Sequence, residues 1–230
     1  MVTATVVELS CGELSVSEVN AALRGLPDGA QVRITEPRGR HNLSVGLSNK
    51  LSISIEGNAG YFIGGLCDGP DVVVDGFVGW SVGENLMSGS GRVRGNASEC
   101  AAASAHGGIV VVEGDASSRA GISLKGSTLA VAGDVGHMSG FMAQAGTILI
   151  GGDAGSALGD SLYEAVIYVA GKIASLGSDA RLEEISSDDV EEVRRILQAA
   201  RFDHVSAEDV KRVASAKQLY NFDALKDQKY

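Results

Sequence analysis

The chain has 230 residues, a formal net charge of −10 at pH 7 and 44% hydrophobic residues. The acidic balance excludes proteins that bind nucleic acid or anionic membranes, because such binding needs clustered Lys and Arg. Three scattered cysteines form neither a disulfide framework nor a metal-binding pair. The start is not a basic segment followed by an apolar one, and no apolar run approaches the ~20 residues that span a bilayer. We therefore expect a cytoplasmic protein.

Residues 1–37 are expected to form a small α/β cap. The segment SVSEVNAALRGLPDG predicts a helix that starts with a capping box, Ser15 with Glu18, and stops near Gly25. The run QVRIT at residues 31–35 predicts a strand. The next segment, HNLSVGL, is interpreted as a degenerate coil, because Arg38 lies 19 residues before Gly57.

A glycine then recurs every 19 residues without insertion or deletion. The seven repeat glycines are Gly57, Gly76, Gly95, Gly114, Gly133, Gly152 and Gly171. Each follows a short run rich in β-branched residues, such as DVVVDG, IVVVEG or TILIGG. A strict period of about twenty residues is typical of stacked repeats, in which a single unit cannot bury its apolar face alone.

Flanking positions support the stacking. The residues four before, two before and two after the repeat glycine are apolar in 20 of 21 cases. Positions four and two before the glycine share one strand face, because side chains alternate with period 2. A 19-residue unit is too short for a strand, a full helix and their loops. We therefore expect a mainly β protein, with a right-handed parallel β-helix of about seven coils over residues 38–180.

A second set of glycines predicts the corners of the coils. The residue seven after the repeat glycine is a glycine in five copies: Gly64, Gly83, Gly121, Gly140 and Gly159. Glycine there supplies positive φ or close backbone approach without a Cβ penalty. Ala102, Ser98 and Ser117 replace glycines in the Gly95 and Gly114 copies, which leaves the corner geometry of those copies open.

Residues 181–230 are expected to be a C-terminal helical extension that caps the column. In the first predicted helix, apolar residues recur at helical spacing from Val190 to Ala200, behind Ser187 and Asp188. A second helix is predicted from Ser206 to about Tyr220.

Large apolar side chains are expected on the outside of the column as well. Val73, Val111, Leu149 and Tyr168 occupy outward strand positions, and Tyr61, Phe62, Trp80, Met87, Met138, Phe141 and Met142 lie near corners. Extended apolar patches are rare on monomers. Two explanations stay open: either the C-terminal helices cover these residues, or partner subunits contact them.

The search for chemistry finds no catalytic, cofactor-binding or metal-binding residue. His41, His106, His137 and His204 each lack a second ligand or a nucleophile nearby in sequence. The residue after the repeat glycine is Asp115, Asp134 and Asp153 in three consecutive coils, which could form a cation-binding ridge. One Asp per 19 residues supplies too few ligands for calcium, so we favour hydrogen bonds to backbone at the corner.

The repeats resemble a known family. The runs GFVGWSVGENLMSG, GDVGHMSGFMAQAG and GDAGSALGDSLYEA are similar to the GXGXG β-helix domain of the glutamate synthase large subunit, which recurs in formylmethanofuran dehydrogenase. The resemblance covers residues 38–178. The segments ending in EPRGRHNLSVGL and near KQLYNFD resemble the stand-alone β-helix subunit of N-methylglutamate synthase (methylamine–glutamate N-methyltransferase).

This resemblance implies a non-catalytic scaffold subunit within a hetero-oligomer. The implied partners are a class II glutaminase-like amidotransferase subunit and a synthase subunit that carries FMN and iron–sulfur clusters, with no cofactor in this chain. The alternatives are the β-helix subunit of formylmethanofuran dehydrogenase and glutamate synthase itself. A third alternative, a polysaccharide-cleaving β-helix enzyme, is disfavoured because the aspartates are confined to one corner.

Overall fold

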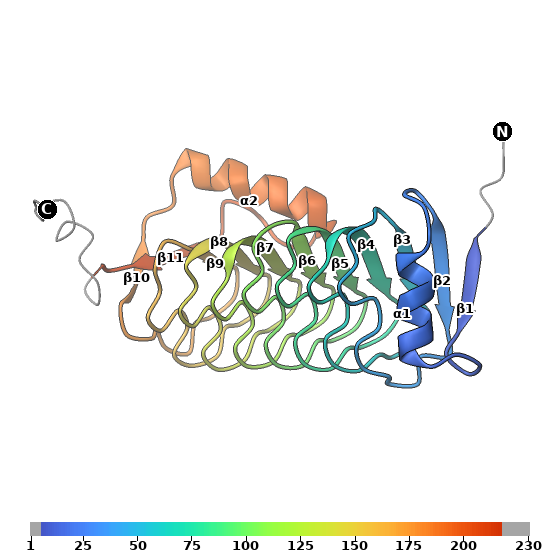
Figure 1. Ribbon diagram of the computed structural model, residues 1–230. Helices are drawn as coiled ribbons and strands as arrows, with labels where there is room; N and C mark the ends of the chain where they lie inside the picture. The colour runs from blue at the N-terminus through green and yellow to red at the C-terminus, as the bar shows by residue number, and fades with distance from the viewer. Residues whose placement is uncertain (1–5, 218–230) are drawn as a thin grey trace, which may run out of the picture.

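The computed structural model describes residues 6–217 as a parallel β-solenoid, a column of stacked coils (Figure 1). One wall of the column is an 11-stranded sheet in the order β1-β2-β3-β4-β5-β6-β7-β8-β9-β11-β10, which confirms the predicted fold class. The strands are β1 (Val7–Ser10), β2 (Gln31–Thr35), β3 (Ser52–Ile55), β4 (Asp68–Val74), β5 (Ser88–Val93), β6 (Ile109–Val112), β7 (Lys125–Val131), β8 (Ala145–Ile150), β9 (Val166–Val169), β10 (Ala180–Glu183) and β11 (Lys211–Ser215).

Two helices flank the column. Helix α1 (Val16–Arg24) lies at its N-terminal end, and α2 (Ser187–Ala200) runs along the outside of the sheet (Figure 1). Helix α1 has the predicted capping box and ends at Gly25. Neither helix of the described chain is long and apolar enough to cross a membrane.

Neighbouring coils pair at the predicted 19-residue spacing. In the sheet, Val74 lies opposite Val93, and Val93 lies opposite Val112. On a second wall, single β-bridges join the residues two after the repeat glycines from Gly76 to Gly171, for example Val78 and Ala97. Because side chains alternate with period 2, a one-residue change in coil length would turn a strand's buried residues outward. This explains why the spacing of the repeat glycines is constant.

The segment before Gly57 forms a further coil, as the sequence predicts, but with a shifted register. Ile34 of β2 pairs with Ile55 of β3, whereas strict 19-residue spacing would place Glu36 there. The corner still stacks, since the Asn42 N–H donates to the Tyr61 carbonyl at 2.8 Å. Strand β1, which the sequence analysis did not predict, pairs in parallel with β2 and ends the sheet.

The interior consists of rows of like residues. The residue two before each repeat glycine is at most 1% exposed in every coil: Ile55, Val74, Val93, Val112, Val131, Ile150 and Val169. This confirms the predicted inward face. A further buried row, six after the repeat glycine, was not predicted and includes Ile63, Val82, Ala101, Ala120 and Leu158.

The corners use left-handed backbone at the same place in successive coils. The predicted positive φ is present at Gly121, with φ 72°. Ala102 occupies the equivalent position in the Gly95 copy with φ 57°, so the corner there keeps its shape without glycine. Residues five and nine after the repeat glycine also have positive φ, including Phe62 and Leu66.

Helix α2 covers the outward apolar face of β6 to β9. Val111, Ala130, Leu149 and Tyr168 on the strands form a second buried cluster with Val193, Ile196, Leu197 and Ala200 on the helix. The explanation that C-terminal structure covers this face is therefore correct for these four strands. Ser54 of β3 and Val73 of β4 lie outside this cluster and remain partly exposed.

Polar contacts fasten both ends of α2 to the sheet. Arg92 of β5 donates to the carbonyls of Ala199 and Ala200 at 3.2 and 3.0 Å, which satisfies carbonyls that lack partners at a helix C-terminus. At the other end, the Tyr168 hydroxyl donates to Asp189 Oδ1 at 2.5 Å. Asp189 is also part of the capping box with Ser186 that begins the helix.

The prediction of a second C-terminal helix from Ser206 is wrong within the described residues. The chain instead forms β11, which inserts antiparallel between β9 and β10. Strand β9 would otherwise leave a row of unpaired N–H and C=O groups at the end of the column, and pairing with them outweighs the local helical pattern. Residues 218–230, including Tyr220, lie outside the described residues.

Val112→Asp tests the inward face. The substitution places an unpaired carboxylate in the middle of the column and is expected to cost about 4 kcal/mol or more, enough to prevent stable folding. Ser117→Asp adds the same charge at an exposed position of the same coil and is the control. Circular dichroism with thermal melting gives the comparison. Equal melting temperatures for both variants would contradict the assigned face.

Asp189 predicts a pH dependence of stability. Burial alone would raise the pKa of Asp189, but hydrogen bonds from Ser186, Tyr168 and Arg212 outweigh burial and hold the pKa well below its usual range. Because the folded chain holds this proton less tightly, the contribution is complete above a pH of about 4 and is lost on acidification. Asp189→Asn should therefore be destabilised by about 1–2 kcal/mol at pH 7.

The difference between the Asp189→Asn variant and the wild type should shrink as the pH is lowered below about 4, because the Asp189 carboxyl of the unfolded chain takes up its proton at a higher pH than that of the folded chain. Urea titrations at several pH values measure it. Asp188→Asn removes the same charge from the first turn of α2, at an exposed side chain, and is the control. A difference that is independent of pH would contradict the role assigned to Asp189.

Candidate interaction surface

The four histidines lie apart, and three of them have a defined polar contact. His41 accepts from the Tyr61 N–H at 2.8 Å, His137 Nδ1 lies 3.0 Å from Ser156 Oγ, and His204 Nε2 lies 3.1 Å from the Ala132 carbonyl. Within residues 6–217, no group of three His, Cys, Asp or Glu side chains is arranged to hold a metal ion. The expectation that this chain has no catalytic or cofactor-binding residue stays a prediction.

The aspartate ladder binds backbone, as the sequence analysis favoured. The Asp115 carboxylate accepts from the Asp134 N–H at 2.9 Å, and the Asp134 carboxylate accepts from the Asp153 N–H at 2.6 Å. Asp153 accepts in the same way from Lys172. The bonded N–H belongs to the next coil, however, and not to the same corner. Each of these hydrogen bonds, from the N–H of one coil to the side-chain oxygen of the coil before it, therefore joins two coils, and we call each one a rung.

This rung explains the repeat glycine. Gly133 is the repeat glycine of the coil that stacks on the coil of Asp115. A Cβ on Gly133 would overlap Asp115 Oδ1. The same overlap with the side chain one coil earlier occurs at Gly76, Gly114, Gly152 and Gly171. Among the seven repeat glycines only Gly57 has positive φ. At these positions glycine is needed because a Cβ would overlap the side-chain oxygen of the Asp or Asn (Asx) residue one coil earlier. Six of the seven repeat glycines do not need glycine for a positive φ.

The ladder is broken at one coil. Asn58 and Asn96 occupy the rung position and accept from the next coil, but between them stands Phe77. A phenylalanine has no acceptor, and the Asn96 N–H has no hydrogen-bond partner among residues 6–217. The Phe77 side chain is 55% exposed. One rung is therefore missing, and a large ring lies on the surface beside it.

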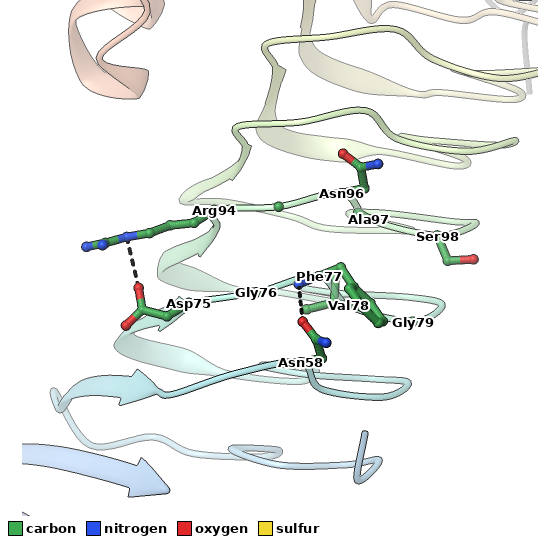
Figure 2. A pocket seen from close by; sticks show the side chains of 11 residues that line it. Asn58, Asp75, Gly76, Phe77, Val78, Gly79, Arg94, Asn96, Ala97 and Ser98 are labelled. Carbon is green, nitrogen blue, oxygen red and sulfur yellow. Dashed lines mark hydrogen bonds and ion pairs between the residues drawn. The ribbon is translucent and has the colours of Figure 1, made fainter. Parts of the chain in front are cut away.

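A groove of about 1010 Å³ surrounds the missing rung. It is lined by Asn58, Asp75, Gly76, Phe77, Val78, Gly79, Arg94, Gly95, Asn96, Ala97 and Ser98. Figure 2 shows Asn58, Phe77 and Asn96 on successive coils, with the Arg94–Asp75 ion pair, 3.0 Å long, on the other side of the groove. The groove is formed by three coils of the N-terminal half of the column.

An aromatic stack borders this groove. The rings of His41 and Tyr61 lie 4.3 Å apart, and those of Tyr61 and Trp80 lie 5.2 Å apart. Tyr61 adjoins the groove, since a Cβ on Gly79 would overlap its ring. Large exposed side chains on the same two coils are Tyr61, Phe62, Leu66, Phe77, Trp80 and Met87. We call the groove together with the rings of Tyr61, Phe77 and Trp80 the aromatic face.

On the aromatic face, apolar side chains that the sequence placed on the outside of the column are not covered by α2. Met138, Phe141 and Met142, which the sequence also placed near corners, are half-buried in the later coils. The sequence analysis did not predict that Phe77 and Leu66 are exposed. The signal for Phe77 is in the sequence, because Phe77 interrupts the series of Asp and Asn residues that follow the repeat glycines. The stacking of His41 on Tyr61 could not be anticipated, because it depends on the shifted register of the first coil.

Comparison with known proteins gives one partial similarity and no family. No protein-family model matches the chain. A segment of 75 residues is 41% identical to Protein GlxC of Rhizobium meliloti (strain 1021). This segment covers 31% of the present chain and 33% of GlxC. Because the match spans only a third of that protein's length, any activity or assembly is transferred only as a proposal.

Replacing Asp134 tests the rung. Asp134→Ala leaves the Asp153 N–H without its acceptor and should lower the melting temperature by about 2–4 °C, the equivalent of about 1 kcal/mol. Asp134→Asn keeps the acceptor and removes only the charge, so the difference between the two variants isolates the hydrogen bond. Differential scanning calorimetry measures both. If alanine and asparagine give the same melting temperature, the rung does not stabilise the column.

Proposed function

We propose that this chain is a scaffold subunit of a glutamate-synthase-like multi-subunit enzyme in the cytoplasm, without an active site of its own. The observation that carries the proposal is the aromatic face, which lies exposed on a rigid column. Patches of this kind are rare on monomers, and aromatic residues and Met are enriched in subunit interfaces.

The column is suited to holding other subunits at a fixed distance. Each coil is bonded to its neighbours by sheet pairs, by β-bridges and by the Asx rungs, so the whole stack resists bending. A solenoid of this kind presents side chains at regular intervals on a long surface. Such a surface can bind two partners at once and keep them in register.

The assembly we favour forms N-methylglutamate from methylamine and glutamate. This choice rests on the resemblance of the segments ending in EPRGRHNLSVGL and near KQLYNFD to the stand-alone β-helix subunit of N-methylglutamate synthase. The partial identity to Protein GlxC supports only the coarser glutamate-synthase-like assignment. The proposed partners are a class II glutaminase-like amidotransferase subunit and a synthase subunit. FMN and iron–sulfur clusters would be bound by the synthase subunit.

The test is purification of the tagged chain from its native host. We expect the amidotransferase and the synthase subunit to co-purify in fixed ratio, and the flavin absorbance to accompany the complex. The chain produced alone should show neither flavin absorbance nor glutaminase activity, and stoichiometric appearance of either would refute a scaffold role. Co-purification of a molybdenum or tungsten enzyme with an amidohydrolase would instead identify the β-helix subunit of formylmethanofuran dehydrogenase.

A further inference from the structure

We propose that the groove at Phe77 is a docking site for a loop of a partner protein, and that this loop places an Asp or Glu carboxylate on the Asn96 N–H. This inference deepens the proposed function and rests on it only for the identity of the partner. The loop would supply from outside the oxygen that an Asx side chain supplies at the other rungs.

The repeat itself shows which group the site accepts. In five coils, an Asp or Asn side-chain oxygen lies against the repeat glycine of the next coil and accepts from the N–H that follows this glycine, at 2.6–3.1 Å. At Gly95 a Cβ would overlap the carbonyl oxygen of Gly76, so the backbone of the preceding coil accounts for this glycine. The Asn96 N–H is the group that lacks, within residues 6–217, the acceptor that the other rungs have.

The charges in the groove favour a carboxylate. The ladder positions beside Phe77 are the neutral amides Asn58 and Asn96, whereas three later coils carry aspartate. Both amide oxygens are engaged with backbone N–H groups, so their NH₂ groups are left as donors. Asp75 is neutralised by Arg94. A carboxylate would therefore find donors here and no unpaired acidic group lining the groove, and hydrogen bonds to an ionised acceptor are the stronger ones.

The form of the groove favours a polypeptide over a small molecule. Small-molecule sites enclose most of the ligand surface, whereas this groove is an open face crossed by an exposed ring. It continues into Tyr61 and Trp80, so an apolar side chain of the loop can pack on Phe77 while neighbouring residues contact the aromatic stack.

The first experiment uses the isolated chain. Phe77→Asn restores an acceptor and should raise the melting temperature by about 2–4 °C and slow hydrogen exchange at the Asn96 amide. Phe77→Ala removes the ring without adding an acceptor and should show neither effect. If Phe77→Asn is no more stable than Phe77→Ala, the missing-rung interpretation is overturned.

The second experiment locates the partner. A photo-crosslinking phenylalanine analogue replaces Phe77 in the full chain in the native host, and Lys172, the exposed residue at the same position of the last coil, is the control site. We expect one protein to be cross-linked from position 77 and none from position 172, with an Asp or Glu within a few residues of the attachment site. Phe77→Asn should reduce co-purification of that protein about tenfold or more.

The outcomes separate this inference from the proposed function. Cross-linking to the amidotransferase or synthase subunit supports both. Cross-linking to a different protein through an acidic loop, with loss of binding in Phe77→Asn, supports the docking site and removes the proposed function. Cross-linking to another copy of this chain, equal yield from both positions, or no product overturns the docking site.

Discussion

The structure depends on a single constraint, that each coil must place its backbone N–H and C=O groups opposite those of the next. The sheet, the β-bridges and the Asx rungs all use the same 19-residue offset. Buried backbone groups are costly when unpaired, so a coil of different length between β3 and β9 would have to shift all three kinds of contact. The offset changes only near the two ends, between β2 and β3 and between Leu158 and Leu176. The repeat glycine satisfies this constraint at its tightest point, where the side chain of one coil reaches the backbone of the next.

Much of the fold could be predicted because the repeat makes each position visible seven times. The inward rows at Ile55 and Val112 and the positive φ at Gly121 follow from local chemistry repeated at fixed spacing. The capping box at Ser15 follows from its local sequence alone. Strand β11 could not be predicted in the same way. It exists because β9 presents an open edge, and that edge is a property of the folded column, absent from the sequence around Lys211.

The candidate surface was predictable only in part. Tyr61 and Trp80 were expected near a corner, but their stacking with His41 and the groove at Phe77 depend on which coils lie next to one another. The Asx ladder was understood as a set of local caps, whereas its bonds run between coils. That difference matters, because replacing one side chain of the series leaves the N–H of the next coil, and not of its own coil, without an acceptor.

Helix α2 also restricts where the column can gain or lose a whole coil. It is held at Asp189 to β9 and at Ala199 and Ala200 to β5, and these strands are four sheet spacings apart. Four spacings of about 4.8 Å come to about 19 Å, and the helix between these contacts, at 1.5 Å per residue, is about 17 Å long. The length of α2 therefore matches the distance between β5 and β9. A coil gained or lost between β5 and β9 would detach one end of α2, whereas a whole coil added between β3 and β5 would leave both attachments in place.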